Sequence, residues 1–164
     1  MSAISFGEPA WNVSSRNRVL NLLGYDDELI RKFVVCNTRF LILPGIQVRN
    51  LASHLLASFE KRLVAEWSSE FASPVHFFET FVDPKRFYGT CYKAANWIQI
   101  GQTKGFSKRG ASHSRNSGSK LVYLRSPNRK LQHKLKSAEN DHANAIPRKA
   151  SLPTAKRKSY RPAA

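Results

Sequence analysis

The sequence predicts an α/β domain whose mixed β-sheet contains a central strand, helix, strand unit. Residues 33–43 (FVVCNTRFLIL) are rich in β-branched and aromatic side chains and end at Pro44-Gly45, which is typical of a strand. Residues 50–71 place apolar side chains at helical spacing, and residues 75–82 carry them on both alternating faces. Short connections between these elements favour a parallel pair of strands.

Before this unit, residues 3–6 fit a short strand, and residues 17–31 have helical periodicity that Gly24-Tyr25 interrupts. We therefore expect two short helical pieces or a turn in residues 17–31. Residues 33–43 fit either one strand or two half-strands that meet at a bulge or a tight turn at Asn37-Thr38.

After the unit, the sequence predicts a turn at Pro84, a short helix in residues 89–97 and a strand in residues 98–101. A last strand, residues 120–124, follows a flexible Gly-, Ser- and Lys/Arg-rich loop. Beyond Ser126 we find no core, although Leu131 and Leu135 fit one face of a short basic helix. We therefore expect a domain in residues 1–125 and a basic, mostly disordered tail in residues 126–164.

Positive charge is concentrated in the last third of the chain. Residues 1–103 hold eleven Lys and Arg against nine Asp and Glu, whereas residues 104–164 hold sixteen against two. Such an excess fits a solvated extension or an arm that neutralises phosphates, and the two are compatible. We expect nucleic acid as a partner, DNA in the first place. No helix-turn-helix or zinc finger supports sequence-specific recognition.

The cysteines and histidines set the remaining expectations. Cys36 and Cys91 lack C-x-x-C spacing, and no secretory signal precedes them, which favours a reducing cytoplasm. The apolar runs are too short and too interrupted to span a membrane. The histidines show no metal-ligand spacing with one another or with the cysteines, so we expect no metal site and no cofactor.

Candidate catalytic residues are concentrated between Phe77 and Gly105. Glu79 and Asp83 are four residues apart on an extended segment, and such a pair can share a proton, divide acid and base roles or bind a divalent ion. The structural alternative buries Glu79 against Arg39 or Arg86 and uses Asp83 to cap the Pro84 turn.

A second group of candidates lies in the predicted helix of residues 89–97. Cys91 and Tyr92 lie near the helix start, where the helix N-terminus lowers the pKa of a thiol and a tyrosine can protonate a leaving group. Asn96 follows four residues after Tyr92. The alternative is that these side chains, and the indole of Trp97 with its N–H on a carbonyl, serve packing. With Glu79 and Asp83, Tyr92 and Asn96 complete the candidate catalytic set.

Basic and aromatic side chains together suit single-stranded or distorted nucleic acid, where bases stack and phosphates pair with cations. Aromatic Phe87, Tyr88 and Phe106 lie among several basic residues in this part of the sequence. The candidate nucleic-acid-binding residues are Arg86, Lys93, Lys104, Lys108, Arg109 and Arg115.

Three segments resemble the Druantia anti-phage system protein DruA family: NTRFLILP at 37–44, NLASHLL at 50–56, and residues 79–97 with GQTKG at 101–105. The resemblance covers residues 5–125. It implies a role in phage defence or mobile-element biology, with other proteins of a defence or transposon operon as partners. Family members usually carry a sizeable region ahead of this part, so we expect an N-terminally shortened copy.

The predicted order of elements is similar to the C-terminal two-thirds of the GNAT acyltransferase-like fold. That analogy places Gln47, Asn50 and Ala52 where the family's pyrophosphate loop precedes the main helix. Asn50 stands where Gly is expected; Asn tolerates a positive φ, but its side chain would crowd the pyrophosphate. The analogy therefore implies a shared fold with acyl-CoA binding lost.

Three hypotheses for function remain open from the sequence. The first is a module that binds nucleic acid through residues 104–119 and the tail. The second is an enzyme acting on a nucleotide, nucleic acid or acyl donor near Glu79. The third is a non-functional remnant of a longer gene.

Overall fold

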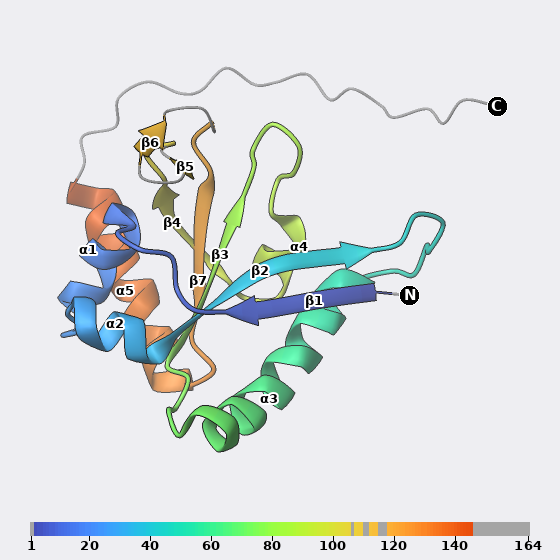
Figure 1. The fold of residues 1–164 in the computed structure, drawn as a ribbon, viewed down its shortest axis with the longest axis horizontal. Helices are drawn as coiled ribbons and strands as arrows, with labels where there is room; N and C mark the ends of the chain where they lie inside the picture. Colours follow the sequence, from blue (N-terminus) through green and yellow to red (C-terminus); the bar gives the residue numbers. More distant parts are fainter. Residues whose placement is uncertain (1, 106, 110–111, 115–117, 146–164) are drawn as a thin grey trace.

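A five-stranded mixed sheet forms the centre of the computed structural model, which describes residues 2–105, 107–109, 112–114 and 118–145 (Figure 1). Only the β2–β3 pair is parallel, and the other neighbours are antiparallel. Across the sheet the strands are β1 (Ser2–Gly7), β2 (Val34–Ile42), β3 (Phe77–Val82), β7 (Leu121–Arg125) and β4 (Ile98–Gln102). A separate hairpin pairs β5 (Ser107–Arg109) with β6 (Ser112–Ser114).

Helices cover both faces of the sheet (Figure 1). One face carries α1 (Ser14–Leu22), α2 (Asp27–Phe33) and α5 (Arg129–Ala145). The other face carries α3 (Leu51–Phe71) and α4 (Thr90–Ala94). The α/β class and the central strand, helix, strand unit are therefore confirmed, with α3 connecting the parallel strands β2 and β3.

The central strand β3 is buried on both faces because successive side chains of a strand point in opposite directions. Phe77 packs in the core under α1, α2 and α5, and Phe78 packs in the core under α3 and α4. Residues 34–42 form one strand, β2, and its pairing with β1 shows that this strand is bulged. Ser5 pairs with Arg39 and Phe6 pairs with Asn37, so β2 carries one extra residue, Thr38, opposite β1.

The core extends past residue 125, where the sequence suggested that the domain ends. Leu135 and Ala138 of α5 are buried against the sheet, and Leu131 packs partly against the same core. Positions 131, 135 and 138 share one face of a helix. The many Lys and Arg residues on the other faces made this segment resemble a solvated tail. Residues 146–164 lie outside the described part of the chain.

A second difference concerns residues 105–119, which we expected to be a flexible loop. The structure places the β5–β6 hairpin within them. Residues 106, 110–111 and 115–117 lie outside the described residues. Among the helices that the structure describes, none combines the length and apolar character needed to cross a membrane.

Gly89, which precedes α4, fixes the position of that helix against the sheet. Its φ is +67°, and a Cβ placed there would lie 2.4 Å from the hydroxyl oxygen of Tyr123 on β7. Gly89→Ala therefore combines backbone strain with a steric clash, and we expect it to lower the free energy of unfolding by about 3 kcal/mol. Urea denaturation followed by circular dichroism measures this change.

The matched control is Gly24→Ala, because Gly24 has φ +85° but open space around its Cβ position. This variant introduces backbone strain without a clash, and we expect it to lower the free energy of unfolding by about 1 kcal/mol. Equal losses in the two variants would contradict the tight Gly89–Tyr123 approach.

Candidate functional site

Glu79 of β3 is sealed inside the protein and paired with Arg16 of α1. Its Oε2 lies 2.8 Å from Nη1 of Arg16, and the two side chains are 0% and 3% exposed. The backbone N–H of Ala10 donates to Oε1 at 2.6 Å, and Arg16 also donates to the Ala10 carbonyl at 2.7 Å. Burial raises the pKa of Glu79, and the Arg16 guanidinium opposes that rise. The sequence correctly suggested a buried, paired Glu79, but the partner is Arg16 rather than Arg39 or Arg86.

The two cysteines are poor nucleophiles in this structure. Burial, and then the Glu79 carboxylate, raise the pKa of Cys36 to about 12, and burial also raises the pKa of Cys91. Both thiols therefore stay protonated at neutral pH, whereas the thiolate is the reactive form. Among the described residues, no group of three or more His, Cys, Asp and Glu side chains is arranged to hold a metal ion.

Tyr92 lies on the opposite face of the sheet from Glu79. Its hydroxyl donates to Oδ1 of Asn37 at 2.7 Å and accepts from Oγ1 of Thr80 at 3.5 Å. Burial raises the pKa of Tyr92 to about 12. Because Glu79 and Thr80 are neighbours on β3 and point to opposite faces, Glu79 and Tyr92 do not meet in one site.

Asp83 and Asn96 also have structural partners. Oδ1 of Asp83 accepts from the N–H of Lys85 at 3.0 Å, which supports the expected cap on the Pro84 turn. Asn96 has a left-handed backbone (φ 65°), and its carbonyl accepts from Nε2 of Gln132 at 2.7 Å. The structure thus does not bring the four candidate catalytic residues together.

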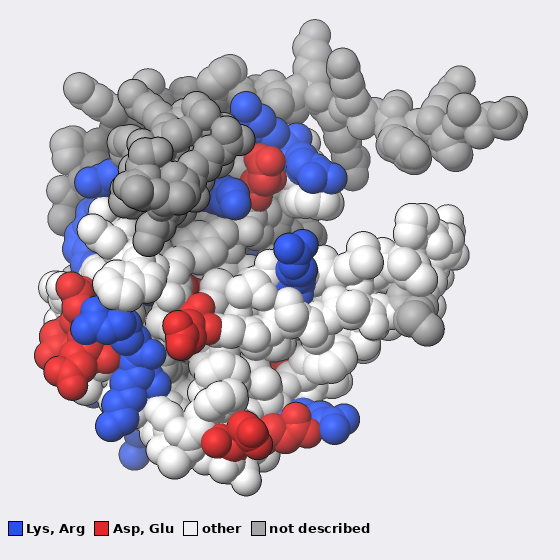
Figure 2. Space-filling view, in the orientation of Figure 1, with Lys and Arg blue, Asp and Glu red and all other residues white. Residues whose placement is uncertain are grey.

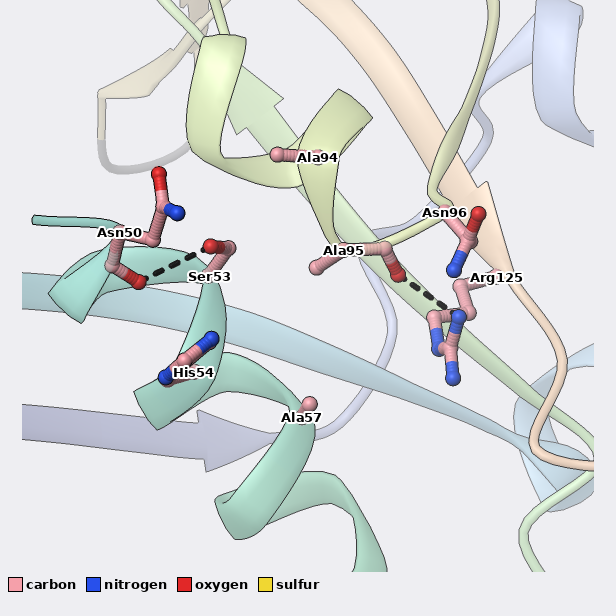
Figure 3. Close-up of a pocket in the computed structure, with 8 residues that line it drawn as sticks. All are labelled: Asn50, Ser53, His54, Ala57, Ala94, Ala95, Asn96 and Arg125. Atoms are coloured by element: carbon pink, nitrogen blue, oxygen red, sulfur yellow. Dashed lines mark hydrogen bonds between the residues drawn. The ribbon is translucent and has the colours of Figure 1, made fainter.

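A cavity of about 320 Å³ lies between the first turns of α3 and the end of α4 (Figure 3). Figure 3 shows the α3 residues on one wall of the cavity. The end of α4 and Arg125 of β7 form the other wall. Its lining contains two of the predicted site residues, one from each wall. The lining residues are Asn50, Ser53, His54, Ala57, Ala94, Ala95, Asn96 and Arg125.

The N-terminus of α3 opens onto this cavity without a side-chain cap. Asn50 adopts the left-handed conformation (φ 58°), which Asn tolerates better than most residues, and its side chain accepts no capping hydrogen bond. The first turn has no acidic residue, so its N–H groups keep their positive partial charge. Of the other two loop candidates, Gln47 is exposed and Ala52 is partly buried in the first turn.

Arg125 is held firmly at the edge of the cavity by a buried network that the sequence did not reveal. Its Nε donates to Oε2 of Glu60, and its Nη1 donates to the Ala95 carbonyl at 2.7 Å. The other Glu60 oxygen accepts from Nε1 of Trp97 at 2.7 Å, so the indole binds a carboxylate rather than the expected carbonyl. Burial raises the pKa of Glu60, and Arg125 opposes that rise.

A second candidate surface lies where β3 and β4 end and β7 begins. Val82 and Gln102 both pair with Leu121, so the loops that follow or precede them meet at one edge of the sheet. We call this edge the basic end and define it by six exposed side chains, four basic and two aromatic. They are Lys85, Arg86, Phe87, Tyr88, Lys104 and Lys120.

The two aromatic rings of the basic end are unusually open, since Phe87 is 58% and Tyr88 is 76% exposed. The Arg86 guanidinium lies 5.5 Å from the centroid of the Phe87 ring. Figure 2 shows basic side chains at the top of the view with acidic atoms among them, and further basic side chains at the left beside acidic ones. Asp83 is the acidic residue of this edge, and its carboxylate already accepts a hydrogen bond from the turn.

The other predicted nucleic-acid-binding residues are placed only in part. Lys93 is exposed on α4. Lys108 and Arg109 belong to β5, whose side chains are outside the described part of the structure, and Arg115 and Phe106 lie outside the described residues. The predicted set omitted Lys85, the neighbour of Arg86, and Lys120, which only the pairing of β7 with β3 and β4 brings to the same edge.

The model of the family described as Druantia protein DruA matches residues 1–135. The match supports the resemblance carried by residues 37–44, 50–56 and 79–105, and it reaches into α5. No match to the chain was found among the curated proteins or the solved structures. The GNAT acyltransferase-like topology therefore stays a prediction.

Replacing Arg16 tests the buried ion pair. Arg16→Met leaves the Glu79 carboxylate buried without its counter-charge, and we expect a loss of about 3–5 kcal/mol in the free energy of unfolding. The pKa of Glu79 should then rise further above its unfolded value of about 4.3. The folded state then binds a proton that the unfolded state releases, so the stability of the variant falls as pH rises above that value.

Urea denaturation at several pH values between 4 and 8 measures this dependence. The control is Arg62→Met, which removes an exposed partner of Glu66. A loss of stability in Arg16→Met that does not grow with pH relative to the parent chain would contradict the assigned role of the pair.

Proposed function

The chain belongs to the Druantia DruA family, which associates it with anti-phage defence, and we propose that it binds nucleic acid through its basic end. One observation carries the proposal: four exposed cations and two exposed aromatic rings converge on one edge of the sheet from loops far apart in the sequence. Such a combination matches the phosphates and bases of a single strand.

The charge of the basic end comes from positions held close by the fold. A Cβ placed on Gly118 would lie 3.6 Å from Cε of Lys85, so Lys85 lies against the segment that leads to Lys120. The chain has a formal net charge of +16. Residues 104–164 hold sixteen of its Lys and Arg residues and two of its Asp and Glu residues. Contacts between these Lys and Arg side chains and phosphates would release counterions, so the affinity for nucleic acid should fall steeply with salt.

The aromatic rings favour a single strand over a duplex. Phe87 and Tyr88 follow the Asp83 turn and precede Gly89, which packs against Tyr123, so the loop that carries the rings is anchored at both ends. Exposed rings on an anchored loop can stack on unpaired bases, whereas the bases of a duplex are already stacked. Stacking contributes about 1–3 kcal/mol per base.

The enzyme hypothesis retains one supporting observation, which is the cavity at α3. Glu79, Asp83 and Tyr92 are engaged in structural contacts, but the uncapped α3 N-terminus and Arg125 both line the cavity. These groups suit an anionic part of a nucleotide or acyl donor. We treat this as the second candidate function.

Removing two cations from the basic end tests the first proposal. For Lys85→Ala/Arg86→Ala we expect weaker binding of a fluorescent single-stranded DNA. Each lost phosphate contact removes about 0.7 from the slope of log affinity against log salt, so the slope should decrease in magnitude by about 1.4. Fluorescence anisotropy over a salt series measures both quantities.

The matched control is Arg31→Ala/Lys32→Ala, which removes two exposed cations from α2. Near-ultraviolet circular dichroism on the same samples establishes that each variant is folded. Equal effects of the two double variants would show that net charge, and not the basic end, determines affinity. A parent chain without a near-ultraviolet signal would favour the remnant hypothesis instead.

Removing the two rings tests the preference for single strands. Phe87→Ala/Tyr88→Ala should weaken binding to single-stranded DNA by at least about 5-fold, because stacking contributes about 1–3 kcal/mol per base. Binding to a duplex of the same length should change little. Trp11→Ala is the control, since Trp11 is an 83% exposed ring elsewhere on the surface. Equal losses for the single strand and the duplex would contradict a stacking role.

A further inference from the structure

The end of α3 carries an aromatic pair that the proposed function does not use. The ring centroids of Trp67 and Phe71 are 4.4 Å apart, and Phe71 is 58% exposed. They border a surface cavity of about 490 Å³ whose lining also includes Leu63, Glu66 and Glu70. We call these five residues the α3 aromatic patch. Trp67 is partly buried against the core, so the open part of the pair is Phe71, and an exposed ring beside a hollow is typical of a surface that receives another segment.

The α3 aromatic patch is negative in a chain that is strongly positive overall. Glu66 and Glu70 are exposed, and the last turn of α3 has no basic residue to offset the partial negative charge of the helix C-terminus. Arg62 pairs with Glu66 at 2.5 Å, but the two side chains are 76% and 57% exposed. Such an exposed pair is screened by solvent and exchanges readily for another cation.

We propose that the α3 aromatic patch is the docking site of the chain's own basic segment, residues 146–164. This segment holds six Lys and Arg and no acidic residue, and Tyr160 lies between Lys158 and Arg161. Its cations match the two carboxylates of the patch and the faces of the Trp67 and Phe71 rings. Its apolar side chains match the open aromatic surface.

The length of the segment permits this docking within one chain. Residues 146–164 span up to about 60 Å when extended, at roughly 3.3 Å per residue. The segment continues from α5, which is about 25 Å long at 1.5 Å per residue. The extended segment is therefore about twice as long as that helix or more. The segment can therefore pass from α5 to α3, which lie on opposite faces of the sheet (Figure 1). Tethering in one chain gives a high effective concentration, which favours this occupant over a second molecule.

Docking at the α3 aromatic patch does not depend on the proposed binding of nucleic acid. The test is a zero-length carbodiimide crosslink on the full chain, which joins a carboxylate to a lysine that touches it. We expect crosslinks from Glu66 or Glu70 to Lys149, Lys156 or Lys158, located by mass spectrometry after digestion. Their yield should exceed that at the exposed Glu8 and Glu28 several-fold and should fall with added salt.

Phe71→Ala separates docking from simple charge attraction because it keeps both carboxylates. We expect a several-fold loss of the crosslinks to Glu66 and Glu70 in this variant and no loss in the control Trp11→Ala, which removes another exposed ring. Equal yields at Glu8, Glu28, Glu66 and Glu70, or no effect of Phe71→Ala, would overturn the proposal. Crosslinks between isotopically labelled and unlabelled chains, mixed before reaction, would overturn the assignment to one chain.

Discussion

The ion pair between Glu79 and Arg16 is the interaction that fixes α1 on its face of the sheet. Glu79 lies on the central strand, where its carboxylate is 0% exposed, and it binds both Arg16 and the backbone of Ala10. One side chain thus attaches the β1–α1 connection and α1 to the middle of the sheet. A buried carboxylate tolerates no loss of its partners, so the position of α1 is closely specified.

Thr80, the next residue of β3, points to the other face of the sheet and helps to fix the helices there. Thr80 and Asn37 form hydrogen bonds with Tyr92 and thereby position α4, while Glu60 connects α3 to Arg125 and Trp97. Because α4 is fixed and Gly89 packs on Tyr123, the end of the loop from Asp83 to Gly89 is held in place against the sheet. The exposed residues of the basic end therefore stand on a rigid support, which favours a preorganised binding surface.

The sequence predicted the elements of the fold well because their signals are local. The apolar residues on both faces of 75–82, the helical stripe of 50–71 and the break at Gly24 each correspond to an element or a boundary in the structure. The partner of Glu79 was out of reach, since Arg16 is 63 residues away and sits in a polar helix. Likewise, the surrounding lysines concealed the packing face of α5, and the position of Lys120 required the strand order.

The most direct test of nucleic-acid binding at the basic end is a map of backbone amide shifts in the full chain, recorded by nuclear magnetic resonance during titration with a short single-stranded DNA. We expect the largest shifts in residues 85–89, at Lys104 and in residues 118–120, and no shifts around the α3 cavity. Shifts confined to Asn50, Ser53 and Asn96 around the cavity would contradict binding at the basic end and favour a site for a phosphate-bearing ligand. A folded chain without any shift would exclude nucleic-acid binding under those conditions.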